Sequence, residues 1–130
     1  MSRLLLDSTV LIDALRGRPA AARVLGLRRA GVEPWTCAIS VEEIERGLRP
    51  GEEIAARRLF GALRTAPLGA PEGERAGRWR RTFAGRGVTL HQADCLIAAA
   101  ALGVGAGLAT ANVADFPMDG LRVEHWPVGE

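Results

Sequence analysis

The sequence has no lysine and no tyrosine, and its two cysteines and two histidines are each isolated. Cys37 and Cys95 form neither a CxxC pair nor a cluster with histidine at zinc spacing, so we expect two buried, reduced thiols rather than a disulfide or a zinc site. No GxSxG segment occurs, and neither cysteine has a matching arrangement of histidine and asparagine. Nucleophilic hydrolases therefore have little support.

Missing patterns also exclude two further classes of protein. The GVGAG run at 103–107 follows a predicted helix and precedes a predicted strand, the reverse of the dinucleotide-binding order, and no GxxxxGK[ST] loop occurs. The segment at 1–15 carries only short apolar runs, broken by Asp7 and Asp13, so it is neither a secretory signal nor a membrane span. We therefore expect a cytoplasmic protein without a membrane segment.

What the sequence does contain is typical of one folded domain. Its 130 residues, 48% hydrophobic and 25% charged, fit a single domain over 1–130. The net charge is only +2, but all 17 basic residues are arginines, which suit contact with phosphate groups. One arginine-rich segment is typical either of a phosphate-binding groove or of a solvated amphipathic helix. It contains Arg75, Arg78, Arg80, Arg81 and Arg86, with Trp79 and Phe83 between them.

Hydrophobic patterning predicts strands that alternate with helices. Apolar runs predict buried strands at 4–6, 35–39 and 107–110 and an edge strand at 122–126. Helices are expected from residue 8 onward and at 19–30, 40–47, 52–64, 72–84 and 89–102, with an extended link at 65–71. This order indicates an α/β domain whose mainly parallel sheet is covered on both faces. Such sheets bind ligands beyond the carboxyl ends of their strands.

Two aspartates stand where such a sheet places functional groups. Asp7 follows the first strand, although aspartate is also a favoured cap for the helix that comes next. Asp94 lies in the first turn of a helix whose body at 95–102 is apolar on all sides, so a carboxylate there needs a partner. The helix dipole supplies part of that partner, which leaves a purely structural role for Asp94 open.

For the other polar candidates, position in the sequence does not separate a functional role from a structural one. Periodicity places Glu42 and Glu43 away from the core without choosing between them, and Glu43 also fits a capping box that begins at Ser40. A second capping box is expected from Thr89. Asn112 and Asp115 follow the third predicted strand, where such residues are also common turn formers.

These acids have no nucleophile and no histidine base among them. Oxygen ligands suit hard divalent cations, and Mg²⁺ is typically held by one or two carboxylates together with waters and substrate phosphates. Converging carboxylates without a basic partner repel one another, and a bound cation removes that repulsion. The pattern therefore predicts metal-assisted hydrolysis of a phosphodiester bond.

Four segments, in order, resemble the motifs of the PIN-domain family and, within it, those of VapC-type toxins. LLLDSTVLID at 4–13 resembles the N-terminal strand with its first acid, Asp7. SVEEIERGL resembles the second motif, in which an acid stands four residues before a glycine, so Gly47 selects Glu43. HQADCLIAAAAL resembles the third, an aspartate that opens an alanine-rich helix, and selects Asp94. ATANVADF resembles the fourth, with Asn112 where some members have aspartate.

The resemblance covers about residues 3–126 and implies both a fold and a function. The implied fold is a three-layer α/β/α domain with a mainly parallel central sheet. The implied function is that of an endoribonuclease toxin of a type II (VapBC) toxin–antitoxin pair, with Mg²⁺ or Mn²⁺ as cofactor and RNA as substrate. Asp7, Glu43 and Asp94 are the implied metal ligands. A homodimer and a cognate VapB-type antitoxin that blocks the site are implied as partners.

The departure at Asn112 leaves the last ligand open. Asn112 offers a carbonyl oxygen close to the strand end and Asp115 offers a full carboxylate; we favour Asn112, with Asp115 as an outer ligand. Thr9 or Thr110 is expected to orient water or a ligating acid. Two other functions stay open, a non-catalytic RNA- or protein-binding PIN module and a DNA-directed nuclease, because no motif here recognises a 2′-hydroxyl.

Overall fold

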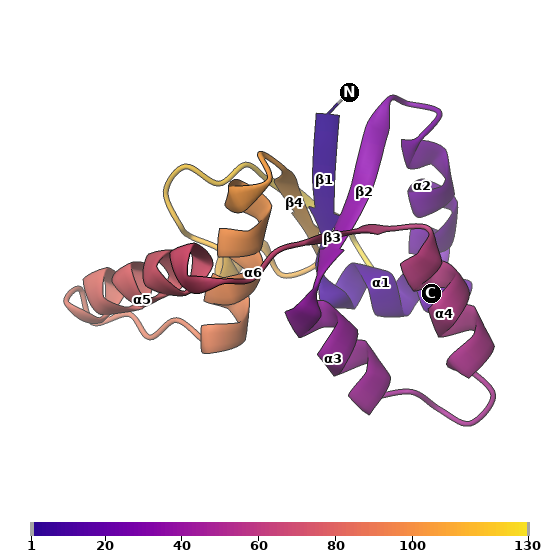
Figure 1. Cartoon of the computed structure of the whole chain (residues 1–130), viewed down its shortest axis with the longest axis horizontal. Coiled ribbons are helices and arrows are strands. Elements are labelled where there is room, and N and C mark those ends of the chain that lie inside the picture. The colour runs from indigo at the N-terminus through magenta and orange to yellow at the C-terminus, as the bar shows by residue number, and fades with distance from the viewer. Residues whose placement is uncertain (1, 130) are drawn as a thin grey trace.

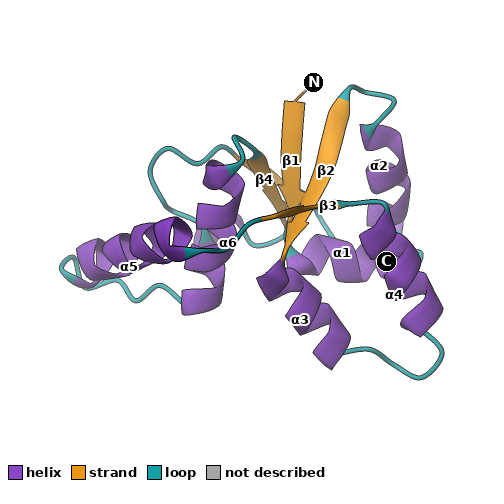
Figure 2. Cartoon of the chain, in the orientation of Figure 1, coloured by secondary structure: helices purple, strands orange, loops and turns teal. Residues whose placement is uncertain are grey.

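A five-stranded sheet lies between two groups of helices in the computed structural model, which describes residues 2–129 (Figures 1 and 2). Each pair of neighbouring strands is parallel, and the strand order is β3-β2-β1-β4-β5. The strands are β1 (Ser2–Leu6), β2 (Val32–Cys37), β3 (Arg64–Ala66), β4 (Gly107–Thr110) and β5 (Val123–His125). The helices are α1 (Ser8–Leu15), α2 (Pro19–Leu27), α3 (Ala38–Arg46), α4 (Glu53–Gly61), α5 (Ala70–Ala84) and α6 (Gln92–Gly103), with a 3-10 turn η1 (Val113–Asp115).

The central strand β1 explains why both faces of the sheet are covered. Successive side chains of a strand point to opposite faces, so Leu5 packs toward α5 and α6, and Leu4 and Leu6 pack toward α1 and α2. All three leucines are buried. An uninterrupted apolar run is what a strand with two covered faces requires, and the predicted buried strand at 4–6 is confirmed.

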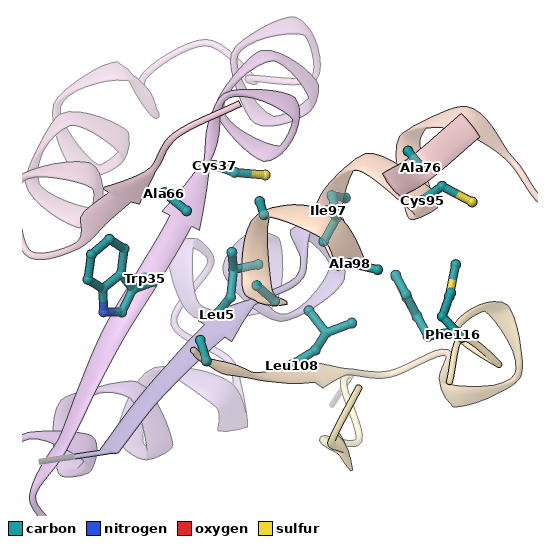
Figure 3. Close-up of a cluster of buried hydrophobic side chains, with 14 of the residues drawn as sticks. Leu5, Trp35, Cys37, Ala66, Ala76, Cys95, Ile97, Ala98, Leu108 and Phe116 are labelled. Carbon is teal, nitrogen blue, oxygen red and sulfur yellow. The ribbon is translucent and has the colours of Figure 1, made fainter. Parts of the chain in front are cut away.

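Helix α6 forms the inner layer on one face of the sheet. Its residues Ala98–Ala101 are buried, and small side chains allow a helix to lie close to the strands beneath it. Ile97 reaches into a cluster with Leu5 and Leu108 of the sheet, as Figure 3 shows. Helix α5 packs against α6, burying Phe83 in the same cluster. The predicted buried helix is therefore confirmed.

Some predicted boundaries are wrong. The second strand is Val32–Cys37 rather than 35–39, and α3 begins at Ala38 instead of residue 40. The link expected at 65–71 overlaps a short strand, β3, which pairs with β2 at the sheet edge. Three residues with two polar side chains carry too little apolar pattern to reveal a strand.

Neither predicted capping box forms. Ser40 lies inside α3, and the cap of α6 is His91, which makes no side-chain capping bond, so Thr89 is outside the helix. Asp7 does cap α1, accepting a hydrogen bond from the Ser8 N–H, and this role is compatible with a second one described below. Both cysteines are buried and unbridged, as predicted.

The sheet topology creates one crevice at its carboxyl edge. From β1 the chain first builds β2 and β3 on one side and then returns to build β4 and β5 on the other. The order therefore reverses between β1 and β4, and ligands of open parallel sheets bind at such a switch point. Within residues 2–129, no helix has the length and apolar character needed to cross a membrane.

Asp13 provides a test of how the N-terminal helices are held. Its buried carboxylate accepts hydrogen bonds from the N–H groups of Ala20, at 3.0 Å, and Gly129, at 2.9 Å. Asp13→Ala leaves both donors without this acceptor, so we expect the free energy of unfolding to fall by about 2–4 kcal/mol in urea titrations. Asp119→Ala, at an exposed loop position, should change it by less than about 0.5 kcal/mol. Equal effects of the two substitutions would show that Asp13 has no such structural role.

Candidate active site

The carboxylate of Asp7 lies at the switch point and is held from three sides. Its Oδ1 accepts a hydrogen bond from the Ser8 N–H at 2.8 Å. Its Oδ2 accepts one from the Thr110 hydroxyl at 2.7 Å and one from the Thr9 hydroxyl at 3.2 Å. Because Thr110 ends β4 and Asp7 follows β1, the Thr110 bond joins the two strands across the crevice.

The two threonine hydroxyls also hold the loop after β4. The Ala111 N–H donates to Thr9 Oγ1 at 3.3 Å, and the Asn112 N–H donates to Thr110 Oγ1 at 3.0 Å. Each hydroxyl therefore accepts from the loop and donates to Asp7, which fixes the loop relative to the acid. Both threonines orient an acid, which is one of the two roles expected for them.

Glu43 is brought to the same place by α3. The Ser8 hydroxyl donates to Glu43 Oε1 at 2.6 Å and lies 3.0 Å from Ser40 Oγ. Since Ser8 has one hydroxyl proton and a carboxylate can only accept, Ser40 supplies the proton of the second bond. The structure thus separates Glu43 from Glu42, which points away and pairs with Arg46 at 3.1 Å.

Ser8 and Ser40 are site residues that the sequence analysis missed. The sequence pattern gives Ser8 no role beyond the start of a helix, and it places Ser40 in a capping box. The available signal was the position of Ser40 three residues before Glu43, which places both side chains on one side of a helix. The same spacing is compatible with a capping box and with two side chains that contact one residue of a neighbouring helix.

Asp94, in the first turn of α6, is half-buried and faces the other acids. Burial raises its pKa to about 6 from 3.8, and the negative charges of Asp115, Asp7 and Glu43 add to the shift, against a smaller opposing effect of His91. Burial is also the main cause of a raised pKa for Asp7, and it outweighs the three hydrogen bonds that favour the ionised form. The acids therefore share one electrostatic environment.

The loop after β4 places Asn112 and Asp115 differently. Among the carboxylates, Asp115 has the largest effect on the pKa of Asp94. Asp115 also lines a hollow of about 130 Å³ together with His91 and Asp94. Asn112 lines a separate, larger hollow of about 560 Å³, which Asp115 shares. Asp115 thus contributes to the environment of Asp94, whereas Asn112 does not line the hollow that contains Asp94.

Within the part of the chain that the structure describes, no salt bridge balances this group of carboxylates, and His91 only partly offsets the effect of the acidic neighbours on Asp94. The salt bridges there involve other acids, and none includes Asp7, Glu43, Asp94 or Asp115. No three histidine, cysteine, aspartate or glutamate side chains among residues 2–129 are close enough to form a complete metal cage. Carboxylates that lie together without a salt-bridge partner nevertheless fit Mg²⁺, which needs only one or two carboxylates from the protein.

The arginine-rich segment forms the outer part of α5 and the loop after it. Its five arginines are exposed and form no salt bridge with the described residues. Phe83 faces the core and Trp79 packs partly against it, as the amphipathic-helix interpretation predicts. Arg80 also donates to the Leu90 carbonyl at 3.2 Å, which ties α5 to the loop that leads to Asp94.

Comparison with known proteins gives consistent results for sequence and structure. The PIN domain family model matches residues 4–116. Ribonuclease VapC19 of Mycobacterium tuberculosis is 37% identical over 119 residues, which cover 88% of this chain and 92% of the relative. Ribonuclease VapC10 of the same organism is 35% identical over 115 residues, covering 88% and 86%.

Solved structures share the fold at lower identity. VapBC2 from Rickettsia felis, bound to a DNA fragment from its promoter, superposes with a TM-score of 0.81 at 21% identity, over 95% of this chain and 98% of that chain. DNA-bound VapBC from Salmonella typhimurium gives a TM-score of 0.78 at 21% identity, over 97% and 99%. The family model matches most of the chain, and the VapC relatives are more than 30% identical to it. The all-parallel sheet, with its acids at the switch point, agrees with both results. The chain therefore belongs to the PIN-domain family, in its VapC group.

Proposed function

We propose that the protein is an endoribonuclease and the toxin of a type II toxin–antitoxin pair. The observation that carries this proposal is the group of carboxylates at the switch point, where the pKa values of Asp7 and Asp94 are raised and none of the acids forms a salt bridge in the described chain. The names of the VapC relatives, which are ribonucleases, support RNA as the substrate. The structural neighbours include VapBC complexes, which support an antitoxin as the partner.

Asp7, Glu43, Asp94 and Asp115 are the residues that would hold Mg²⁺ or Mn²⁺. When bound, such a cation activates a water molecule for attack on phosphorus and neutralises the charge that develops on the phosphate. We propose Asp115 in place of Asn112 as the fourth ligand, because a charged carboxylate that already influences Asp94 suits a cation better than a neutral amide does.

The hydroxyl side chains act as positioning residues in this proposal. Thr110 and Thr9 hold the Asp7 carboxylate in one orientation, and Ser8 does the same for Glu43. Hydrogen bonds of this kind keep an anionic group from turning away from its neighbours when electrostatic repulsion favours separation. The backbone of the loop after β4 is fixed by the same threonines, so the position of Asp115 depends on them.

The exposed arginines of α5 are suited to bind the phosphate backbone of RNA. Arg75, Arg78 and Arg81 recur every third residue and therefore lie along one side of the helix. Their guanidinium groups form no salt bridge in the described chain, which leaves them available for phosphate oxygens. Helix α5 stands at the side of α6, the helix that carries Asp94 (Figure 1).

The proposal also includes the protein partners. An antitoxin that inserts a basic side chain among the carboxylates would supply the charge that the cation otherwise provides. The homodimer implied by the resemblance and the cytoplasmic location expected from the N-terminal segment remain predictions.

The first prediction concerns cleavage. We expect the protein to cleave single-stranded RNA only with Mg²⁺ or Mn²⁺, and Asp94→Asn to reduce the rate about 100-fold or more, because a few kcal/mol of transition-state stabilisation depend on the cation. Gel assays with RNA and with DNA of the same sequence provide the measurement, and Asp119→Asn is the control. Wild-type rates in a chelator, or in folded Asp94→Asn, would contradict the mechanism, and preferential DNA cleavage would contradict the substrate.

The second prediction concerns stability and pH. The pKa of Asp94 is raised to about 6 in the fold, so the wild-type protein loses stability as pH rises from about 4 to about 6. Asparagine carries no charge, and we expect Asp94→Asn to have a higher Tm than wild type near pH 7, with the difference vanishing near pH 4. Mg²⁺ should raise the Tm of wild type at neutral pH but not that of the variant. A lower Tm for the variant at every pH would show that Asp94 is a structural residue.

The third prediction concerns toxicity. Expression of the wild-type protein should arrest growth, because the proposed substrate is cellular RNA, whereas Asp94→Asn at the same protein level should not. Co-expression of a cognate antitoxin should restore growth. Colony counts and immunoblots measure the two quantities, and normal growth with intact, folded wild-type protein would contradict the toxin assignment.

A further inference from the structure

A second hollow lies beside the candidate active site, beyond the carboxyl ends of β4 and β5. Its volume is about 560 Å³, within the range of about 300–1,000 Å³ that small-molecule pockets occupy. Its walls are small apolar residues, one amide, one imidazole and one carboxylate. They are Ala111, Asn112, Val113, Ala114, Asp115 and His125.

Thr110 connects this hollow rigidly to the acids. Its hydroxyl donates to Asp7 and accepts from the Asn112 N–H. Its carbonyl accepts a hydrogen bond from the Trp126 N–H at 2.9 Å, and its strand partner in β5 is His125. A group bound between Asn112 and His125 would therefore be held at a fixed place next to the carboxylates.

The side-chain amide of Asn112 has no role in the local fold. Asn112 precedes η1 at the capping position, yet its side chain makes no capping hydrogen bond, and it is exposed. The backbone of the residue is anchored through its N–H at the wall of the hollow, and its exposed side-chain amide can donate and accept hydrogen bonds. Asparagine amides commonly bind base edges in nucleic-acid recognition.

The remaining walls suit a flat, unsaturated ring. His125 is exposed at the end of β5 and offers an imidazole face, and unpaired RNA bases stack on such aromatic side chains. Val113, with 41% of its surface exposed, and the two alanines supply apolar contact. These walls fit a base better than a sugar or a phosphate.

The charge of the hollow decides which base it favours. None of its lining residues in the described chain is an arginine, and Asp115 would repel a phosphate. A carboxylate and an amide oxygen accept hydrogen bonds, so they favour bases with an exocyclic amino group, namely adenine, cytosine and guanine. Uracil has no exocyclic amino group and offers only its ring N–H as a donor on this edge, so it is less favoured.

From this geometry we infer that the hollow is a subsite for an unpaired RNA base next to the scissile phosphate. Asn112 selects an amino-bearing base and His125 stacks on it. The inference rests on the proposed ribonuclease function and adds a specificity to it. Asp115 lines both hollows, so a base bound in this one would lie next to the proposed metal-binding acids.

The experiment uses short single-stranded RNAs that differ only in the base beside one cleavage site. We expect wild-type kcat/KM to favour adenine, cytosine or guanine over uracil about 5-fold or more, Asn112→Ala to remove that preference, and Asn112→Asp, which still accepts hydrogen bonds, to retain it. His125→Ala should weaken binding of all four RNAs, and His125→Phe should restore it, because stacking needs only an aromatic face. Asp119→Ala is the control, and thermal melts show whether each variant is folded.

Binding is measured separately in the Asp94→Asn background by fluorescence anisotropy without metal. This distinguishes failure of the subsite from failure of the proposed function. Absence of RNA cleavage by wild type would contradict the function, whereas cleavage with the same base preference in wild type and in Asn112→Ala would overturn the subsite. Equal binding of all four RNAs by Asp94→Asn would also overturn it. Variants that lose antitoxin binding while their RNA preference is unchanged would assign the hollow to the antitoxin instead.

Discussion

The hydrogen bond from Thr110 to Asp7 is the contact on which the organisation of the site depends. It spans β1 and β4 at the point where the strand order reverses, and it joins residues 103 positions apart in the sequence. Both strands are buried on each face, so neither end can move without disturbing the packing around Leu5 and Leu108. The rigidity of the sheet is thereby transmitted to a carboxylate that repulsion from other acids would otherwise displace.

The same group of acids makes the site unfavourable in the free protein. Burial raises the pKa of Asp7 and Asp94, and their mutual repulsion acts in the same direction for Asp94. A fold that served stability alone would pair such carboxylates with arginine, as Arg16 and Glu52 are paired elsewhere at 3.1 Å. The chain has 17 arginines, yet among residues 2–129 none of them forms a salt bridge with the four acids. It is consistent with a site whose counter-charge comes from a ligand.

Sequence reasoning predicted the layers of the fold better than the details of the site. The run at 4–6 and the alanine-rich helix are apolar on every side, a pattern that has few explanations besides burial on two faces. Strand β3 has no such pattern and is held by its pairing with β2, a long-range contact that local periodicity does not contain. The role of Ser40 is likewise set by a long-range contact, so local spacing predicts only a cap. Its partner, Ser8, is 32 residues away, and only the tertiary structure brings the two hydroxyls together.

The loop after β4 shows how one short segment can serve two sites. The hydroxyls of Thr9 and Thr110 hold the start of its backbone. The residues that follow form η1, a single turn. Asn112 comes before this turn and Asp115 ends it, and of the two residues only Asp115 lines the hollow that contains Asp94. The asparagine that departs from the acidic form of the family motif therefore need not weaken the group of carboxylates, because Asp115 already contributes a charge to it. An uncharged residue at 112 also avoids adding a further negative charge near Asp7, whose pKa is already raised. A change from acid to amide at this position is thus compatible with a complete metal site, and it frees a donor and an acceptor for contact with the substrate.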